Sequence, residues 1–165
     1  MGHRLSLLIT ASAIFLSCAS REPIRGKQSG ALPATPIETL EGSATDLAGF
    51  LHGRPALVSL WATWCDTCVD EAPALNRLDS EARKGGDAVV VGVAVGETTE
   101  TVRAFATTRK LAYTQLVDPE FRFADTLGER QVPATLVVDR TGRIVFRGKA
   151  LDAESLAAFR RVAKR

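Results

Sequence analysis

The fold of this chain is decided by a buried strand that runs directly into a pair of cysteines, Leu57-Val58-Ser59-Leu60-Trp61-Ala62-Thr63-Trp64-Cys65-Asp66-Thr67-Cys68. The strand belongs to a nearly continuous apolar run at residues 55–62, and a second, valine-rich run covers residues 88–95. Such runs are typical of central strands in a parallel sheet. Between them, apolar residues at steps of three and four predict an amphipathic helix that ends at Gly85-Gly86. Strand, helix and strand with this spacing predict a right-handed βαβ crossover.

Weaker patterns outside this unit predict the remaining elements. Alternating apolar residues indicate strands, and three- to four-residue periodicity with capping residues indicates helices. In chain order we expect a strand or hairpin at residues 37–43, a helical turn at 46–51, a helix at 98–110, a short helix that Asp118-Pro119 opens and Gly128 ends, an antiparallel hairpin at 134–147, and a last helix that Asp152 caps.

The composition indicates one soluble domain with a proper core. The chain has 165 residues, 45% of them hydrophobic and 24% charged. A formal net charge of +2 and an aromatic content of 6% argue against a nucleic-acid surface. Three cysteines are too few for a small fold held together by disulfides, so each needs its own explanation.

The first 17 residues are interpreted as a signal peptide. Arg4 precedes an apolar stretch, residues 5–16, which is shorter than the ~20 residues of a membrane-spanning helix. Phe15-Leu16-Ser17-Cys18 resembles the bacterial lipoprotein box, in which Cys18 carries the lipid. The alternatives are ordinary cleavage before Ser20 and an uncut anchor. All three place the domain outside the cytoplasm, where disulfides persist.

A tether and a domain are expected after the signal peptide. Residues 18–36 are rich in Ser, Arg, Pro and Gly and show no apolar periodicity, so we interpret them as a tether. The domain is expected at residues 37–165.

The cysteine pair has the spacing and position for thiol–disulfide exchange. Because a helix N-terminus offers unpaired N–H groups and a positive dipole end, it stabilises a thiolate on Cys65. Cys65 precedes the helix and is expected to be exposed and to attack, whereas Cys68, one turn later, is expected to face inward and resolve the mixed disulfide. The alternatives are an inert disulfide or two buried free cysteines. A metal site is not expected, since only His3, Cys18 and His52 remain as His or Cys ligands, and His52 is interpreted as a solvated turn residue.

Several of these segments together resemble the TlpA/ResA-like branch of the thioredoxin superfamily. They are residues 60–75, Gly96-Glu97, Val132-Pro133-Ala134-Thr135 and residues 139–148, and the resemblance covers nearly everything from about Pro33 onward. That branch comprises membrane-tethered thiol–disulfide oxidoreductases outside the cytoplasm. The resemblance implies an α/β, thioredoxin-like fold, with a central mixed β-sheet flanked by helices and a short N-terminal β extension. It also implies a monomer; no cofactor is expected.

The resemblance assigns roles to residues around the pair. Cys65 and Cys68 would form the redox disulfide, and Pro133 would be a cis-proline that faces it and leaves the backbone of Val132 free to pair with substrate. The alternative for Pro133 is a trans proline that begins a strand. Trp64 would pack beside the pair, shield it and contribute to substrate binding; the alternative is an ordinary core aromatic.

Glu71 is the expected proton handler. It lies three residues after Cys68, so helical geometry brings it towards the cysteines. In the branch that the chain resembles, a glutamate here assists proton transfer, whereas many thioredoxins bury an aspartate six residues before the first cysteine, where this chain has Ser59. The alternative is an exposed helix carboxylate. The chain departs from the family at Thr67, where proline is common, and at Asp66, whose charge opposes the thiolate that the helix end favours.

The expected function is the reduction of protein disulfides outside the cytoplasm, with a membrane electron donor restoring the thiols. By resemblance, the substrates would be cysteines of cytochrome c maturation or of copper-site assembly. The same fold also suits a disulfide oxidase or isomerase. Two further alternatives are a thiol peroxidase, which needs a peroxidatic cysteine beside an arginine, and a copper chaperone, which would need a histidine late in the chain, where none follows His52.

Overall fold

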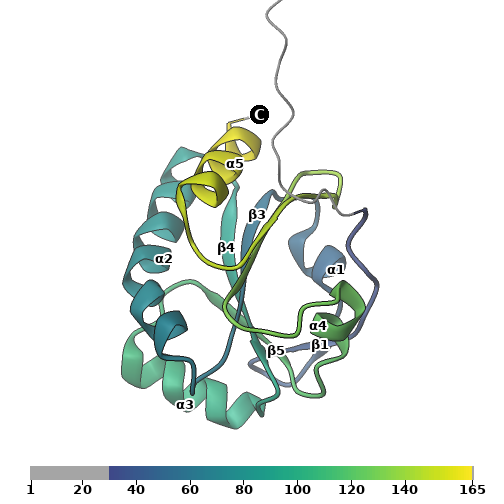
Figure 1. Cartoon of the computed structure of the whole chain (residues 1–165), viewed down its shortest axis with the longest axis vertical. Helices are drawn as coiled ribbons and strands as arrows, with labels where there is room; N and C mark the ends of the chain where they lie inside the picture. The colour runs from purple at the N-terminus through teal and green to yellow at the C-terminus, as the bar shows by residue number, and fades with distance from the viewer. Residues whose placement is uncertain (1–29, 165) are drawn as a thin grey trace, which may run out of the picture.

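This computed structural model describes residues 30–164 of the chain. They fold into a seven-stranded mixed sheet with helices on both faces (Figure 1). The strand order is β2-β1-β5-β4-β3-β6-β7. The thioredoxin-like fold expected from the sequence is confirmed, including the β extension that β1 and β2 form. The strands are β1 Ile37–Thr39, β2 Ala44–Thr45, β3 Ala56–Trp61, β4 Val89–Val95, β5 Thr114–Asp118, β6 Ala134–Val138 and β7 Ile144–Gly148; the helices are α1 Leu47–Leu51, α2 Asp66–Gly85, α3 Thr99–Arg109, α4 Arg122–Leu127 and α5 Ala153–Ala163.

The βαβ unit at the centre of the sheet is confirmed. Every residue of β3 and β4 is buried, and the two strands pair in parallel with α2 as their crossover. Because both faces of these strands are covered, both faces must be apolar, which explains the continuous apolar runs. Strand β6 pairs antiparallel with β3 and continues into β7, so the predicted hairpin is confirmed as well.

Helices cover the two faces of the sheet with separate apolar clusters. On one face, α2 and α5 pack through residues such as Leu75 and Phe159, and α3 packs through Val102 nearer the cysteines. On the other face, α1 and α4 pack through residues such as Leu47 and Phe123. Figure 1 shows α2 and α5 on one side of the sheet and α1 and α4 on the other.

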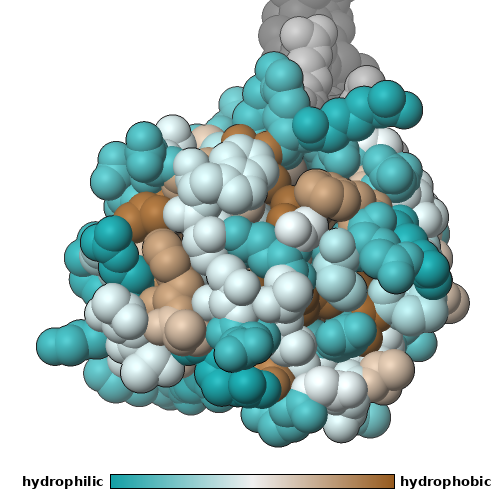
Figure 2. Space-filling model, turned by 90° about the horizontal axis from the view of Figure 1, so that it is seen from below, coloured by the Kyte–Doolittle hydropathy of each residue, from teal (hydrophilic) through white to brown (hydrophobic). Residues whose placement is uncertain are grey.

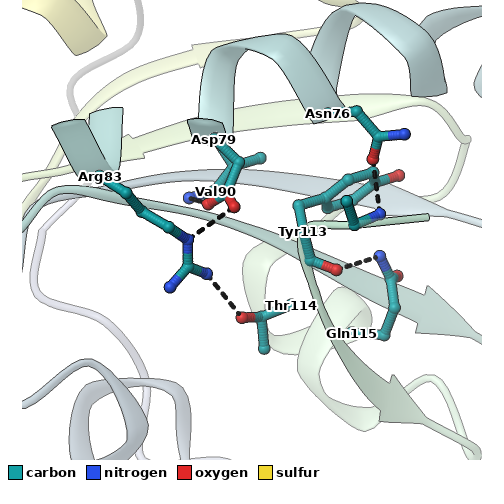
Figure 3. Close-up of polar contacts among 8 residues, drawn as sticks. Asn76, Asp79, Arg83, Val90, Tyr113, Thr114 and Gln115 are labelled. Carbon is teal, nitrogen blue, oxygen red and sulfur yellow. Dashed lines mark hydrogen bonds and ion pairs between the residues drawn. The ribbon is translucent and has the colours of Figure 1, made fainter. Parts of the chain in front are cut away.

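Polar side chains in the middle of α2 fasten this helix to the sheet (Figure 3). The buried carboxylate of Asp79 accepts a hydrogen bond from the Val90 N–H at 3.1 Å and one from Arg83 Nε at 2.7 Å. Asn76 Oδ1 accepts from the N–H of Ala112 at 2.6 Å, and Asn76 Nδ2 donates to the carbonyl of Lys110 at 2.9 Å. The helix that carries the cysteines is therefore held to β4 and to the segment before β5.

The prediction for Asp118 is wrong in one respect. Asp118 ends strand β5, which the sequence patterns did not reveal because its polar residue Gln115 interrupts the apolar run. The helix begins later, after Phe121, and ends at Gly128 as expected. Asp118 still satisfies an N–H of α4, because its Oδ2 accepts from Ala124 N at 3.0 Å, but it does so from the end of the strand.

Part of the predicted tether lies on the domain. Ala31 forms a bridge with Arg143, and the Leu32 N–H donates to the carbonyl of Gly142 at 2.9 Å. The predicted signal peptide, residues 1–17, and the lipidation candidate Cys18 lie outside the described residues. Within residues 30–164, no helix is both long and apolar enough to cross a membrane.

Candidate active site

Cys65 and Cys68 form a disulfide at the start of α2, with their Cα atoms 5.3 Å apart. Cys65 is the N-cap residue of the helix, and its Sγ accepts a hydrogen bond from the N–H of Cys68 at 3.2 Å. This is the contact that would stabilise a thiolate on Cys65 once the disulfide is reduced. The alternative of two buried free cysteines is therefore wrong for this form of the protein, in which the two sulfurs are bonded to each other.

The exposed side chain at this site is Trp64, not Cys65. Cys65 and Cys68 have exposed fractions of only 7% and 4%, whereas that of Trp64 is 67%. The expectation that Cys65 is exposed is therefore wrong for the disulfide form, because its sulfur turns towards Cys68 and the first N–H groups of the helix. The interpretation of Trp64 as a core aromatic is also wrong, since the core position is taken by Trp61.

The loop before β6 lies against the disulfide. The Val132–Pro133 peptide bond is cis, in agreement with the expectation. Val132 packs against the apolar cluster that contains Cys65 and Cys68. No hydrogen bond links the backbone of Val132 to any other residue between 30 and 164. A free backbone donor and acceptor thus lie next to the redox pair.

Glu97 holds the segment that leads into the cysteines. Its carboxylate accepts from the Thr63 N–H at 3.0 Å and 3.2 Å and also binds the Thr63 hydroxyl. Farther along, the Cys65 N–H donates to the carbonyl of Ala62 at 3.1 Å. The sequence placed Glu97 directly after the second buried strand, but nothing in its spacing indicated this contact, which depends on β3 and β4 ending side by side.

Glu71 is half-buried and its carboxylate is engaged at one oxygen. Oε1 accepts from the N–H of Leu151, between β7 and α5, at 3.0 Å, whereas Oε2 is buried without a partner among the described residues. Burial raises the pKa of Glu71; the Leu151 hydrogen bond lowers it, and the neighbouring Asp152 raises it further. The alternative of an exposed helix carboxylate is therefore wrong. Across residues 30–164, no hydrogen bond joins Glu71 to either sulfur.

Comparison with known proteins agrees with this geometry. The sequence matches the Redoxin family over residues 27–159. The chain belongs to this family. Within it, the redoxin also belongs to the TlpA/ResA-like thioredoxin branch that the active-site segment resembles.

Two curated relatives and two solved structures illustrate the similarity of this redoxin to known proteins. It is 28% identical over 109 residues to the thiol-disulfide oxidoreductase ResA of Halalkalibacterium halodurans, covering 66% of this chain and 61% of the relative. It is 34% identical over 113 residues to the thioredoxin-like protein YneN of Bacillus subtilis, covering 68% and 65%. The match thus spans less than two thirds of both relatives. MTB dsbF is similar in structure, with a TM-score of 0.65, 27% identity and 78% and 92% of the two chains covered. A putative protein disulfide isomerase from Bacteroides thetaiotaomicron, with a TM-score of 0.72, 22% identity and coverage of 86% and 92%, shares the fold.

The buried residues that lie level with one another across the sheet beneath α2 are all uncharged in this redoxin. Ser59 lies level with Gly92 on β4 and with Thr135 on β6, and Gly92 in turn lies level with Gln115 on β5. Gly92 has no side chain, and the side chains of Ser59, Thr135 and Gln115 do not titrate near neutral pH. Tyr113, on the same face, does not either, because burial raises its pKa to about 12. Burial raises the pKa of Glu71 towards neutral pH, which makes Glu71 the candidate for proton exchange near the pair.

Proposed function

We propose that this redoxin is a thiol–disulfide oxidoreductase that reduces disulfides of proteins outside the cytoplasm. The observation that carries the proposal is the Cys65–Cys68 disulfide at the N-terminus of α2, beside the cis Val132–Pro133 bond and the unpaired backbone of Val132. The relatives named as thiol-disulfide oxidoreductases support it.

The reaction passes two electrons to the substrate in two exchange steps. In the reduced protein, the Cys65 thiolate attacks one sulfur of a substrate disulfide, and the other substrate sulfur leaves as a thiolate and takes a proton. Cys68 then loses its proton and attacks Cys65 Sγ, so that the second substrate sulfur leaves and the Cys65–Cys68 disulfide forms. The N–H of Cys68, which contacts Cys65 Sγ at 3.2 Å, would stabilise the first thiolate.

The substrate would lie along the loop before β6. The free N–H and carbonyl of Val132 suit pairing with an extended segment, which would bring the substrate disulfide over Cys65. Val132 packs beside the pair, and the exposed side chain of Trp64 borders the same approach.

Glu71 would exchange the proton that Cys68 loses and regains. Because its raised pKa lets the carboxyl group hold a proton closer to neutral pH, Glu71→Gln should slow disulfide exchange most in the range around neutral pH and remove one inflection of the pH–rate profile. Stopped-flow rates of the two proteins across this range test the prediction. Equal rates at every pH would remove Glu71 from the mechanism.

Stability provides the control for Glu71→Gln. Since the folded-state pKa of Glu71 is raised, the fold favours the protonated carboxyl, and this contribution is lost as the pH rises through the folded-state value. The glutamine variant should therefore gain stability relative to the parent as the pH rises from 4 to 7. A variant that is slower but no less stable at pH 7 separates a proton-transfer role from a structural one.

The reducing direction makes a prediction of its own. Equilibration of the Cys65–Cys68 pair with dithiothreitol buffers should give a reduction potential near that of thioredoxin, about −270 mV. A potential near −120 mV, the range of a strong oxidant, would instead assign the protein as a disulfide oxidase.

The location of the activity is part of the proposal. A signal peptide at residues 1–17, lipidation at Cys18 and a tether up to residue 36 would fix the domain, as a monomer, to the outer side of a bacterial membrane. A membrane electron donor would then restore the two thiols. Apocytochrome c and copper-site cysteines are the substrates that the family resemblance suggests.

A further inference from the structure

Basic side chains gather at the end of the sheet that lies opposite the cysteine pair. Strand β3 begins at Ala56, which lies level with Val89 at the start of β4 and with Val138 at the end of β6. Cys65 and Cys68 follow the other end of β3. At ~3.3 Å per residue, the length of β3 separates the two ends by roughly 20 Å.

The exposed cations at this far end come from three separate segments. Helices α2 and α5 both end here, as Figure 1 shows, and carry arginine and lysine in or after their last turns. The hairpin between β6 and β7 adds two arginines, and the guanidinium of Arg140 joins it to the segment before β4 through two hydrogen bonds of 2.7 Å to the carboxylate of Asp87. We call this surface the basic pole; its members are Arg83, Lys84, Arg140, Arg143, Arg160, Arg161 and Lys164.

Acidic side chains at the basic pole compensate only part of its charge. Asp79 and Asp87 form ion pairs with two of its members. Asp139, whose carboxylate accepts hydrogen bonds from its own hairpin, and the exposed Glu81 offset part of the remainder. Within residues 30–164, no ion pair engages the other members of the basic pole. The surface therefore keeps an excess of positive charge.

The end of the molecule that carries the cysteines has the opposite charge. Helices α2, α3 and α4 begin there, after the carboxyl ends of β3, β4 and β5. Exposed acidic residues lie in or next to the first turns of these helices: Asp66, Asp70, Glu100, Glu120 and Asp125. Basic residues at this end, such as Arg122, which pairs with Glu120, are fewer. Figure 2 shows this end, where apolar residues reach the surface between hydrophilic ones.

The described chain enters the domain at the basic pole. Ala31 forms a bridge with Arg143 in the hairpin. The N–H of Leu32 donates to the carbonyl of Gly142 at 2.9 Å. In the sequence just before, residues 21–27 hold three basic residues and one acidic residue. An attachment ahead of residue 30 therefore reaches the domain at its positive end.

We propose that the basic pole lies on the headgroups of an anionic membrane and holds the Cys65–Cys68 pair at the far end of the domain, facing the aqueous phase. The inference rests on the anchored location in the proposed function. Lysine and arginine next to an anionic surface are attracted to it over about a Debye length, ~10 Å at 0.1 M salt. The same surface repels the acidic end, so both ends favour one orientation.

Helix stabilisation explains only part of the basic pole. Cations suit the negative C-terminal ends of α2 and α5. Arg143, in contrast, lies in the hairpin, and the bases of residues 21–27 lie in the chain that leads to it. What these positions share is nearness to the entering chain, as membrane contact requires. An electron donor in the same membrane would then have to present its thiols well above the lipid surface.

Lysine footprinting on vesicles tests the orientation. The full chain is purified from a bacterial host in detergent and reconstituted into phosphatidylcholine vesicles with or without phosphatidylglycerol. A water-soluble acetylating reagent labels exposed lysines, and mass spectrometry gives the rate at each. Lys84 and Lys164 report on the basic pole, and Lys149, which follows β7 near the cysteine end, is the internal reference. Relative to Lys149, both rates should fall about threefold on the anionic vesicles only, and recover at about 1 M salt, where the Debye length is about 3 Å.

Removal of cations from the basic pole should abolish the protection. Arg143→Gln, Arg160→Gln and Arg161→Gln, combined in one variant, leave both reporter lysines in place. Because these side chains are exposed, the fold should tolerate the changes, and insulin reduction at the parental rate checks this. Protection that survives in this variant overturns the proposal, as does equal labelling of the parent on the two kinds of vesicle.

A matched variant controls for total charge. Arg109→Gln, Lys110→Gln and Arg122→Gln together remove the same charge from the end of α3 and the start of α4, outside the basic pole. The two reporter lysines should stay protected on anionic vesicles. Their loss of protection here as well would show that net charge alone acts, which would contradict the proposed orientation.

The remaining outcomes separate this proposal from the proposed function. Parent protein that reduces insulin but shows no protected lysine overturns the orientation alone, whereas parent protein that never reduces insulin overturns the proposed function. Protein recovered from the host without membrane overturns its anchored location, and the lysine footprint on added vesicles then decides whether the basic pole binds lipid. Protection by double-stranded DNA but not by anionic vesicles would assign the basic pole to nucleic acid instead.

Discussion

Cys65→Ser should abolish disulfide exchange, whereas Cys68→Ser should stop it at the mixed disulfide. Cys65 is the sulfur that accepts the Cys68 N–H, so without it no stabilised thiolate attacks the substrate, and the rate should fall about 10³-fold or more. Without Cys68 the first attack still occurs, but no neighbouring thiol releases the substrate. Insulin reduction measures the first effect, and non-reducing gels detect the trapped complex of the second.

Cys18 has to be removed from these experiments. It is the third cysteine of the chain, and a free thiol there would resolve the trapped complex or form complexes of its own. Both variants and the parent should therefore carry Cys18→Ser. Insulin reduction by the Cys65→Ser protein at the parental rate would contradict the assignment, as would Cys68→Ser protein that never accumulates a mixed disulfide.

Asp79→Ala should cause a large loss of stability. The side chain of Asp79 is buried, with an exposed fraction of 3% for the residue, and it accepts hydrogen bonds from Val90 N and Arg83 Nε. Removal of the carboxylate leaves the buried N–H of Val90 unpaired and frees α2 from β4. We expect a loss of about 2–4 kcal/mol, which is a fall of about 1–2 M in the urea midpoint for a protein of this size.

The partner of Asp79 supplies the matched control. The side chain of Arg83 is half exposed, so Arg83→Gln should lower the free energy of unfolding by no more than about 1 kcal/mol. Asp79→Asn retains one acceptor oxygen for Val90 and should fall between the two. Asp79→Ala as stable as Arg83→Gln would show that the polar contacts of α2 contribute little compared with its apolar face.

Elements with a strong local pattern were predictable. The apolar runs of β3 and β4 and the periodicity of α2 follow directly from burial, because a strand covered on two faces and a helix covered on one have different spacings of apolar residues. Strand β5 was missed, since its buried positions include Gln115 and Asp118, whose side chains make contacts only in the folded protein.

Only part of the site was predictable in the same way. The position of Cys65 and Cys68 at a helix start depends on local chain geometry, and the sequence contains it. The burial of Cys65 and the exposure of Trp64 depend on how the start of α2 packs in the folded protein, where Cys65 lies in a cluster with Trp61 and Val132, and no spacing rule describes this packing. The contact of Glu97 with Thr63 and that of Glu71 with Leu151 join residues 34 and 80 positions apart.

The sequence by itself therefore determined the βαβ unit, the redox pair at its helix start and the family resemblance, because each rests on residue types and spacings that lie along the chain. Tertiary structure alone decided which side chains surround the pair. It brought the Val132 loop, Glu97 and Phe121 to the same end of the sheet, because β3, β4 and the loop before β6 meet there although they are distant in the chain. Position in space, and not order in sequence, therefore decides the surroundings of the redox pair.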